Sequence, residues 1–372
     1  MQKALFVGTL LGAALLNAGC TESSNPASST FTPRPTYENR EPEGLTSRLT
    51  GFTVDPEAYF INLANCAPPP ARCALPPLYA EFSPLLQRAV VRNAPITLQD
   101  TVPDPATGRP PDPAPPTVSS AAGLWTLDKV PTRRGPPFFV LSLGGPSAQV
   151  KLANDVPAPP PLVLPPVPEG NYLPTMTIRP VVPAHSACVG LEALQVSDNG
   201  IMEAVAKRLS SEGTAVTVAD LLNPARFGGI TIFWLYQPGF PVFRVPATNT
   251  TVEASSGRVF NIEWAPVGAL PPPLAPLQSA RGFFIPPGPP APNSSLGLVA
   301  IVHPPLMGPP GNVTYTAKDA TTSVPENRPW SLMPLELPQI PGLVIFAGLQ
   351  MAPAVPSATP SIPPPSTCVP GQ

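Results

Sequence analysis

The sequence predicts a mainly β fold of two β-sandwich-like domains, the second with a short helical insertion at about residues 198–222. The 63 prolines of the 372-residue chain divide it into short apolar segments of strand length, and proline cannot donate the backbone hydrogen bond that a central strand needs. These segments are rich in β-branched and aromatic residues and are bounded by Pro and Gly, as is typical of strands. A single stretch, in the second half, has clear helical periodicity.

The chain opens with thirteen apolar or small residues, Ala4 to Leu16, after a short segment with Lys3. A membrane-spanning helix needs about 20 residues, so this run has the length of a signal-peptide apolar region. The segment that ends at Cys20, "LNAGC", resembles the lipobox of bacterial lipoproteins, although Asn17 stands where that family usually has Leu. The resemblance implies that the leader is residues 1–19 and that Cys20 becomes a lipid-modified N-terminus carrying palmitate-type acyl chains.

The alternative for this leader is an ordinary secretory signal cut after Ala18 or Gly19, which leaves Cys20 as a free thiol. Under the lipoprotein interpretation, Thr21 rather than Asp follows the cysteine, which in that family favours the outer membrane. We therefore expect a protein held on the cell envelope, facing the periplasm or the surface. Two or three acyl chains hold a protein on a membrane almost permanently.

The composition limits the partners and the organisation of the chain. A net charge of −2 with only 12% charged residues argues against nucleic acid, which needs clustered Lys and Arg. The 43% of hydrophobic residues and the chain length predict about two domains. The predicted units are a signal peptide at 1–19, a flexible tether at 20–48, a first domain at 49–153, a Pro-rich linker at 154–170, a second domain at 171–352 and a Pro-rich tail at 353–372.

Four cysteines remain after Cys20, an even number that suits disulfides in an oxidising compartment. They are Cys66, Cys73, Cys188 and Cys368. Four cysteines allow three pairings. The short loop between Cys66 and Cys73 favours that pair, and Cys188 with Cys368 follows by elimination. A zinc site is weakly indicated because the spacings differ from the usual two to four residues.

The first predicted domain is read as all-β. Its candidate strands are Ala58–Leu63, Arg88–Arg92, Ile96–Leu98, Gly123–Leu127, Phe138–Leu143 and Gln149–Leu152. The stretches "NAPITLQD", "TVSSAAGLWTLDKVP" and "PPFFVLSL" resemble the carboxypeptidase regulatory-like module, a transthyretin-like β-sandwich. The positions that match are Gly123, Trp125, Leu127, Val130 and Pro131, and a Pro-rich insert at 102–116 lengthens one loop. The resemblance covers about sixty residues and implies a non-catalytic accessory or adhesive module.

The second predicted domain carries the helical segment "SDNGIMEAVAKRLSSEG". Ile201, Val205 and Leu209 recur on one face, Glu203 and Lys207 form an i,i+4 pair, and Asp198 or Asn199 can cap the first turn. A second short helix is predicted from Thr217, with Asp220 three residues later, to Leu222. The predicted strands are Gly229–Tyr236, Val242–Val245, Arg258–Trp264, Gly282–Ile285, Leu296–Val302, Asn312–Ala317 and Leu343–Leu349.

The strand at 229–236 raises the most suggestive binding feature. Trp234 and Tyr236 share one face of it, and if they face water they form a flat platform for a sugar ring or a partner surface. The alternative, which we favour because aromatic residues are usually buried, is a strand buried on both faces.

No catalytic motif stands out. The chain has only two histidines, His185 and His303, and lacks G-x-S-x-G, H-E-x-x-H and phosphate-binding glycine patterns. His185, Cys188 and His303 could hold a metal, but a disulfide at Cys188 is favoured. Asp198-Asn199-Gly200 lacks the alternating ligands of a calcium loop. We therefore predict no catalytic residue, metal or cofactor.

The predicted function is a lipid-anchored envelope protein with a non-catalytic binding or structural role. Expected partners are the membrane, through the lipid, and either carbohydrate or another envelope protein. Two alternatives stay open. One is an envelope hydrolase that uses convergent carboxylates in a deep cleft, and the other is an accessory subunit of an envelope assembly, recognisable by an exposed apolar patch.

Overall fold

The computed structural model describes residues 46–65, 84–100, 115–131, 138–158, 163–181, 188–190, 192–236, 246–288, 294–308, 311–323 and 328–353. Strands account for 41% and helices for 14% of the structure, in several sheets. The predicted mainly β class is therefore confirmed.

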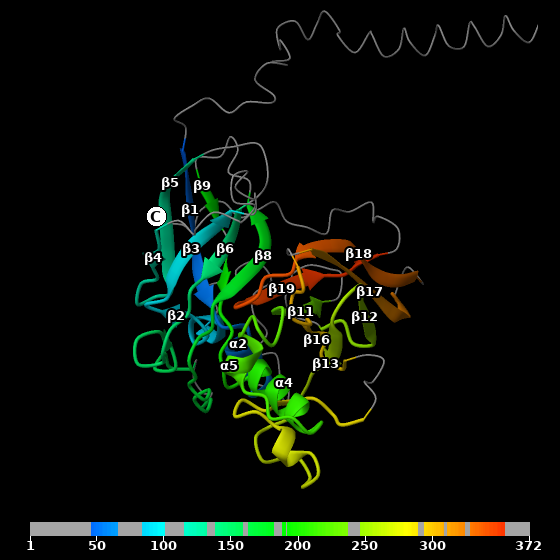
Figure 1. The fold of residues 1–372 in the computed structure, drawn as a ribbon. Helices are drawn as coiled ribbons and strands as arrows, with labels where there is room; N and C mark the ends of the chain where they lie inside the picture. The colour runs from blue at the N-terminus through cyan, green and yellow to red at the C-terminus, as the bar shows by residue number, and fades with distance from the viewer. Residues whose placement is uncertain are drawn as a thin grey trace, which may run out of the picture.

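A mixed eight-stranded sheet forms the centre of the molecule (Figure 1). In spatial order its strands are β13 (Arg258–Asn261), β16 (Leu298–Val302), β11 (Ile230–Tyr236), β19 (Val344–Gln350), β8 (Thr175–Val181), β6 (Phe138–Ser142), β3 (Pro95–Asp100) and β4 (Thr117–Val118). The central pairs β11–β19 and β19–β8 are parallel, whereas the flanking pairs are antiparallel. In the middle of the sheet, β11 and β19 read as mainly apolar runs because both of their faces are covered.

Each face of this sheet has its own core. Ile230, Ile232 and Trp234 of β11 lie in a core shared with the helices. Phe233 and Leu235 lie in a second core on the opposite face. The second core is closed by a smaller sheet of β12 (Thr250–Ala254), β17 (Asn312–Ser323), β18 (Arg328–Pro338) and β20 (Ala352–Pro353). Alternation along β11 thus sends successive side chains to opposite cores.

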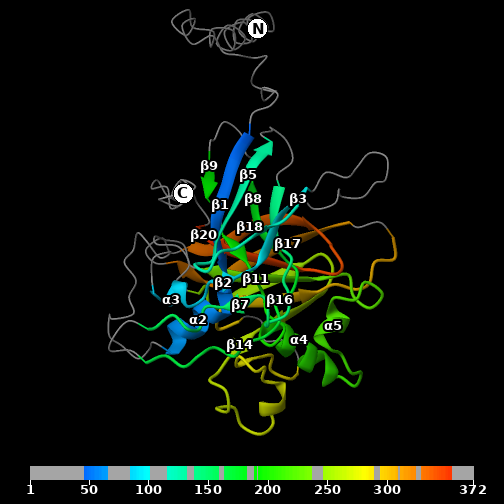
Figure 2. The same cartoon turned by 90° about the vertical axis from the view of Figure 1, so that its left-hand side faces the viewer.

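A third sheet packs on the β3–β6 end of the central sheet. It is built from β1 (Thr46–Val54), β5 (Leu124–Pro131), β9 (Cys188–Gly190) and β10 (Ala193–Leu194). β1 pairs antiparallel with β5 and parallel with β9 and β10. Leu49 and Trp125 of this sheet meet Ile96 and Val140 of the central sheet in a third core. Figure 2 shows β1, β5 and β9 at the end of the molecule opposite α4 and α5.

The remaining described elements are short. They are α2 (Pro56–Asn65), α3 (Pro84–Gln87), α4 (Ile201–Ser210), α5 (Val218–Leu221), a 3-10 turn (Ala275–Leu277) and the strand pairs β2 (Val91–Arg92) with β7 (Lys151–Leu152) and β14 (Glu263–Trp264) with β15 (Phe283–Phe284). Helices α2, α4 and α5 lie on the same side of the central sheet (Figure 1).

The strand predicted at Ala58–Leu63 is wrong, because these residues lie in α2. Asp55 caps this helix by accepting a hydrogen bond from the Ala58 N–H at 2.9 Å, and Pro56 takes the first helical position. An acidic cap followed by proline is a helix-start signal, and the apolar run "AYFINL" concealed it. Phe60 then packs its ring against Trp234, Trp264 and Phe283.

Both predicted helices of the second half are confirmed. In α4, Glu203 Oε1 lies 2.9 Å from Lys207 Nζ, and Ile201 and Val205 are buried. α5 begins at a capping box between Thr217 and Asp220. The expected cap of α4 is wrong: the N-cap position is Gly200, and neither Asp198 nor Asn199 caps the helix with its side chain.

Most strands predicted in described parts of the chain are present, with shifted ends, whereas the longer strands β1, β8, β12 and β18 were not predicted. β1 begins at Thr46, inside the segment expected to be tether. β18 contains Pro329, Pro334 and Pro338, which argue against a strand. β1, β8 and β12 pair with strands distant in the sequence, so local pattern does not reveal them. β18 pairs with its neighbour β17, and its prolines concealed it. The strand predicted at Val242–Val245 lies outside the described residues.

The predicted linker at 154–170 lies between strands of one sheet. β6 precedes it, β8 follows it, and the two strands are hydrogen-bonded in the central sheet. In its described part, Val167 is buried, and the Asn154 side chain bonds both backbone groups of Val167 at 2.8 and 3.1 Å. The two predicted domains therefore contribute strands to the same sheet, and the boundary between them stays a prediction.

Candidate functional site

Three charged side chains meet in the interior where β1 turns into α2. Asp55 and Glu57 come from this corner, and Arg281 comes from the turn before β15. Arg281 Nη1 lies 2.7 Å from Asp55 Oδ2 and 2.9 Å from Glu57 Oε2, and all three side chains are 0% exposed. We call these three residues the charged junction. It contains two carboxylates for one guanidinium.

Asp55 has two further hydrogen bonds. Its Oδ1 accepts the Ala58 N–H at the start of α2, and its Oδ2 accepts the Tyr172 hydroxyl at 2.9 Å. Tyr172 lies just after the predicted linker. Burial and then the charge of Asp55 raise the pKa of Tyr172 well above its ordinary value, so Tyr172 stays a neutral donor.

Glu57 caps a helix that lies far away in the sequence. Its Oε1 accepts the Ile201 N–H at 2.9 Å, at the start of α4, and its Oε2 accepts the Ser197 hydroxyl at 3.1 Å. A carboxylate is stabilised at a helix N-terminus by the unpaired N–H groups and the helix dipole. A Cβ atom on Gly200 would lie 1.8 Å from the Glu57 carboxylate, so only glycine leaves room for this approach.

The excess negative charge of the junction shifts the pKa values of Glu57 and Arg281. Burial raises the pKa of Glu57 to about 7. The charge of Arg281 opposes this rise, and the charge of Asp55 adds to it. For Arg281, burial alone would lower the pKa, but the two carboxylates raise it above its ordinary value. The guanidinium therefore stays charged, and Glu57 is the member that exchanges a proton near neutral pH.

Arg281 also fastens the described end of the predicted linker. Its Nε donates to the Pro168 carbonyl at 3.0 Å, and its backbone N–H donates to the Asn199 carbonyl at 3.2 Å. The Asn199 side chain donates to the Glu169 carbonyl at 2.7 Å, and Asp198 accepts from the Asn171 backbone and side chain. Asp198 and Asn199 thus hold residues 168–171 in place instead of capping α4.

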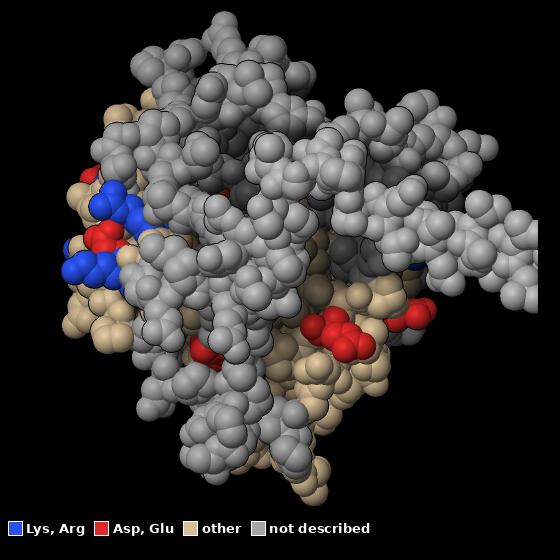
Figure 3. Space-filling model, turned by 90° about the horizontal axis from the view of Figure 1, so that it is seen from above, with Lys and Arg blue, Asp and Glu red and all other residues tan. Residues whose placement is uncertain are grey.

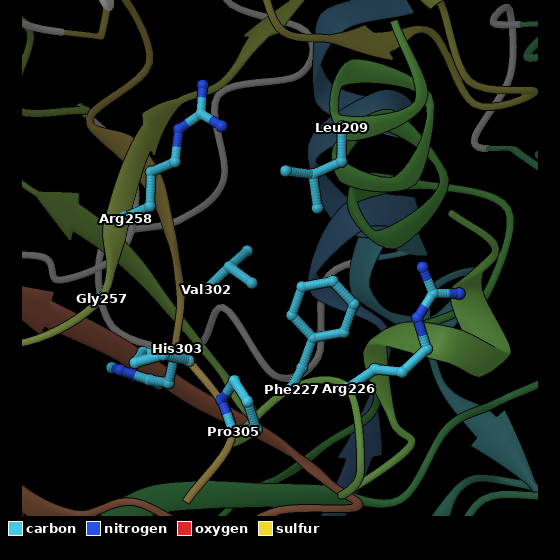
Figure 4. Close-up of a pocket in the computed structure, with 9 residues that line it drawn as sticks. Leu209, Arg226, Phe227, Gly257, Arg258, Val302, His303 and Pro305 are labelled. Carbon is cyan, nitrogen blue, oxygen red and sulfur yellow. The ribbon is translucent and has the colours of Figure 1, made fainter. Parts of the chain in front are cut away.

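A surface hollow of about 340 Å³ lies beside the C-terminal end of α4. Leu209, Val302 and Phe227 line it between Arg258 and Arg226 (Figure 4). Arg258 pairs with Glu212 and Arg226 pairs with Asp220 at 2.7 Å. Both arginines already have carboxylate partners, so the hollow offers an apolar floor and neutralised edges. A second hollow, of about 470 Å³, lies among α4, α5 and the 3-10 turn.

His303 lies at the base of the first hollow but is only 1% exposed. Its Nε2 is 3.1 Å from the Thr231 hydroxyl and 3.0 Å from the Tyr315 hydroxyl. Burial lowers the pKa of His303 to about 4, so it is neutral at physiological pH. Thr231, His303 and Tyr315 thus form a buried cluster of mutually hydrogen-bonded polar side chains.

The aromatic pair singled out in the sequence belongs to the core. Trp234 is 1% exposed, and its ring stacks against Tyr236 with centroids 6.3 Å apart. Tyr236 is partly buried and packs against the same core. The exposed-platform interpretation is therefore wrong, and the favoured alternative, a strand buried on both faces, is confirmed.

The predicted lipidation and disulfide residues fall largely outside the described part of the chain. Cys20, Cys66, Cys73, Cys368 and His185 lie there. The backbone of Cys188 begins β9, opposite Arg48 of β1. Within the described residues, no three His, Cys, Asp or Glu side chains gather as a metal site. No described helix has the length and apolar character needed to cross a membrane.

Figure 3 shows described Lys and Arg side chains beside acidic side chains at one edge of that view. One such ion pair on the molecule is Arg48 with Asp128, 2.7 Å apart and exposed. The exclusion of nucleic acid as a partner stays a prediction from the composition of the whole chain.

Comparisons with known proteins give no family. No family model matches the chain, and no curated protein matches it. Two solved structures are similar at a TM-score of 0.18: the Bacillus anthracis TIE protein, at 9% identity, and a streptococcal ancillary pilin, at 8% identity. The alignments cover 82% and 84% of this chain but 34% and 64% of those chains. This chain thus spans less than two thirds of either, and a TM-score of 0.18 carries no argument about fold or activity.

Sequence reasoning missed the charged junction. Its members are 226 residues apart at the extremes, and no spacing rule connects Arg281 to Asp55 and Glu57. The one local signal was Asp55-Pro56-Glu57 as a helix start. The junction has the convergent carboxylates expected of a hydrolase, but Arg281 lies between them and all three are sealed from solvent. In this structure the pair belongs to a buried ion cluster that joins the start of α2 to the turn before β15.

Proposed function

We propose that the protein is a lipid-anchored cell-envelope protein whose folded body has a non-catalytic binding or structural role. The observation that carries this proposal is the leader, with its thirteen-residue apolar run that ends in "LNAGC". The run is too short to span a bilayer but has the length of a signal-peptide apolar region.

The position of β1 suggests how an anchored body would be oriented. Residues 21–45 separate Cys20 from the first described residue, Thr46. The β1 end of the body would then lie nearer the membrane. Helices α4 and α5, which lie at the opposite end in Figures 1 and 2, would face away from it.

The described structure favours a binding or structural role over hydrolysis. Among the described residues, Asp55 and Glu57 are the only two fully buried carboxylates that share an ion-pair partner. That partner, Arg281, neutralises them in part, and the site is closed to solvent. The hollows beside α4 are lined mainly by apolar and already paired side chains. With Trp234 in the core, a partner protein is favoured over a sugar stacked on that ring.

The test is the fate of Cys20. Wild-type protein and a Cys20→Ala variant are expressed with a palmitate analogue, and the membranes are separated. We expect the wild type to be labelled and to sediment with membranes, and the variant to lose both properties. Thr21→Ala is the matched control and should remain labelled. A Cys20→Ala variant that fractionates with membranes as the wild type does would contradict the anchor.

Mass spectrometry of the mature N-terminus supplies a second readout. We expect the chain to begin at Cys20 with a diacylglycerol and an added acyl chain. A chain that begins with an unmodified Cys20 would instead support an ordinary secretory leader.

A further inference from the structure

The charged junction has one acidic group more than its basic partner can neutralise. Its two carboxylates and one guanidinium carry a formal net charge of −1 when all are ionised, in a site that is 0% exposed. An uncompensated buried charge is costly, and a carboxyl in such a site tends to take up a proton. The junction is therefore close to a balance between two charge states.

The contacts indicate which carboxylate takes up the proton. Asp55 Oδ2 receives both Arg281 Nη1, at 2.7 Å, and the Tyr172 hydroxyl, at 2.9 Å, while Oδ1 receives the Ala58 N–H. Glu57 receives the same Nη1 at the longer distance of 2.9 Å, together with the Ser197 hydroxyl and the Ile201 N–H. Each carboxylate thus has one charged donor and two neutral donors, and the difference between them is that Asp55 has the shorter ion pair.

We propose that the charged junction is a proton-controlled latch, in which a proton on Glu57 leaves a neutral Asp55–Arg281 pair and tightens the contact among α2, α4 and the turn at Arg281. Loss of that proton places a second negative charge in the sealed site and loosens the same contact. The inference does not depend on the lipid anchor.

The charged and titratable groups near Glu57 come from its own helix and from the elements packed against it. They are Asp55 at the start of α2, Arg281 from the turn before β15, and Tyr172, which is hydrogen-bonded to Asp55. The α4 terminus adds the Ile201 N–H, and Glu203 in the first turn of α4 accepts from Ala280 N while paired with Lys207. Within this set of neighbours, the pKa of Glu57 itself is raised to about 7.

The direction of the pH effect follows from linkage. Ionisation of Glu57 is harder in the folded protein, where its pKa is about 7, than in the unfolded chain, where it is about 4.5. The folded state therefore binds more protons between these values, and stability falls as the pH rises through this window. The full effect on the unfolding equilibrium constant is on the order of 300-fold.

The main test is urea unfolding of the full-length chain between pH 4.5 and 8, for the wild type, Glu57→Gln and Glu212→Gln. Glu212 is a matched control, because it lies in a surface ion pair and its pKa is lowered by the hydrogen bond from Arg258. We expect the wild type and Glu212→Gln to lose stability as the pH rises, and Glu57→Gln to lose this dependence. Equal pH profiles for the wild type and Glu57→Gln would overturn the latch.

A local readout separates a latch from a general change in stability. The Ile201 amide donates to Glu57 and should exchange with deuterium more readily as the pH rises, after correction for the intrinsic rate. The Ala300 amide in β16, within the central sheet, should not follow it. Parallel changes at both amides would contradict a localised opening.

If Glu57→Gln does not fold, infrared spectroscopy of the wild type tests directly whether Glu57 carries a proton. A protonated buried carboxyl should appear between pH 5 and 7 and disappear on titration, and its midpoint should shift in Glu57→Asp, which retracts the group from Ile201. Absence of a protonated carboxyl in this range, or an unshifted midpoint in Glu57→Asp, would overturn the proposal.

Discussion

Two ion clusters of three residues lie near α4, and they differ in the ratio of acidic to basic groups and in their exposure to solvent. The charged junction has two carboxylates and one arginine and is wholly buried. At the other end of α4, Glu212 pairs with Arg208 and Arg258, so one carboxylate meets two arginines. Arg258 is 50% exposed. The comparison shows that solvent, more than the number of ion pairs, decides what a cluster contributes.

The physical reason is the dielectric environment. In the surface cluster Arg208 is buried, but Glu212 is 32% and Arg258 is 50% exposed. Water screens the Glu212–Arg258 pair and competes for it, so this pair contributes little. In the buried cluster every charge has lost its hydration, and the removal of one partner leaves an uncompensated charge in the interior. Four substitutions sharpen this contrast, from the largest expected effect to the smallest.

Arg281→Met should be the most destabilising. It leaves Asp55 and Glu57 facing each other without a cation and removes the donor to Pro168. We expect a loss of about 3–5 kcal/mol, measured by urea unfolding of the full chain. Arg258→Met is the matched control and should cost less than about 1 kcal/mol. Similar losses for the two variants would break the comparison between buried and exposed clusters.

Gly200→Ala should come next. The added Cβ would meet the Glu57 carboxylate at 1.8 Å, so Glu57 must withdraw from the α4 terminus and lose charge-assisted hydrogen bonds. We expect a cost of roughly 2 kcal/mol, measured as a shift of the urea midpoint. Gly308→Ala, where a Cβ would meet no atom within 4 Å, should be neutral. A neutral Gly200→Ala would mean that Glu57 does not cap α4.

Thr217→Ala tests a helix cap that is local and exposed. Thr217 and Asp220 cap α5 reciprocally, and the loss of such a cap costs about 1 kcal/mol. Hydrogen bonds from Thr217 lower the pKa of Asp220 to about 2. The contribution of Asp220 is therefore present above its ordinary value of 3.8 and lost as the pH falls towards 2. Thr217→Ser retains the hydroxyl and should behave as the wild type in thermal unfolding.

Glu212→Gln should have the smallest effect. It weakens the pairs with Arg208 and Arg258 at a site about one third exposed, and exposed pairs contribute less than about 1 kcal/mol. The difference from the wild type should shrink further in high salt. A loss as large as that of Arg281→Met, or one insensitive to salt, would show that the surface cluster is not screened.

The local elements were predictable where the chain itself carried the signal. The apolar spacing of Ile201 and Val205 and the Glu203–Lys207 pair identified α4, and Thr217 with Asp220 identified α5. The apolar run at 230–235 identified β11. In contrast, Ala58–Leu63 was misassigned because an apolar stretch of that length is compatible with either a strand or a helix. Asp55-Pro56 carried the deciding signal.

Residue pattern alone was enough to predict the mainly β class and the helices of the second half, and it favoured a strand at 229–236 that is buried on both faces, because each of these depends on neighbours a few positions apart. It also predicts the anchor at Cys20 and the cysteine pairs. Only the tertiary structure decided that strands on both sides of residues 154–170 share a sheet, that Glu57 caps α4, and that Arg281 joins Asp55 and Glu57. Such contacts depend on which distant segments the folded chain brings together, and burial then gives them their energy.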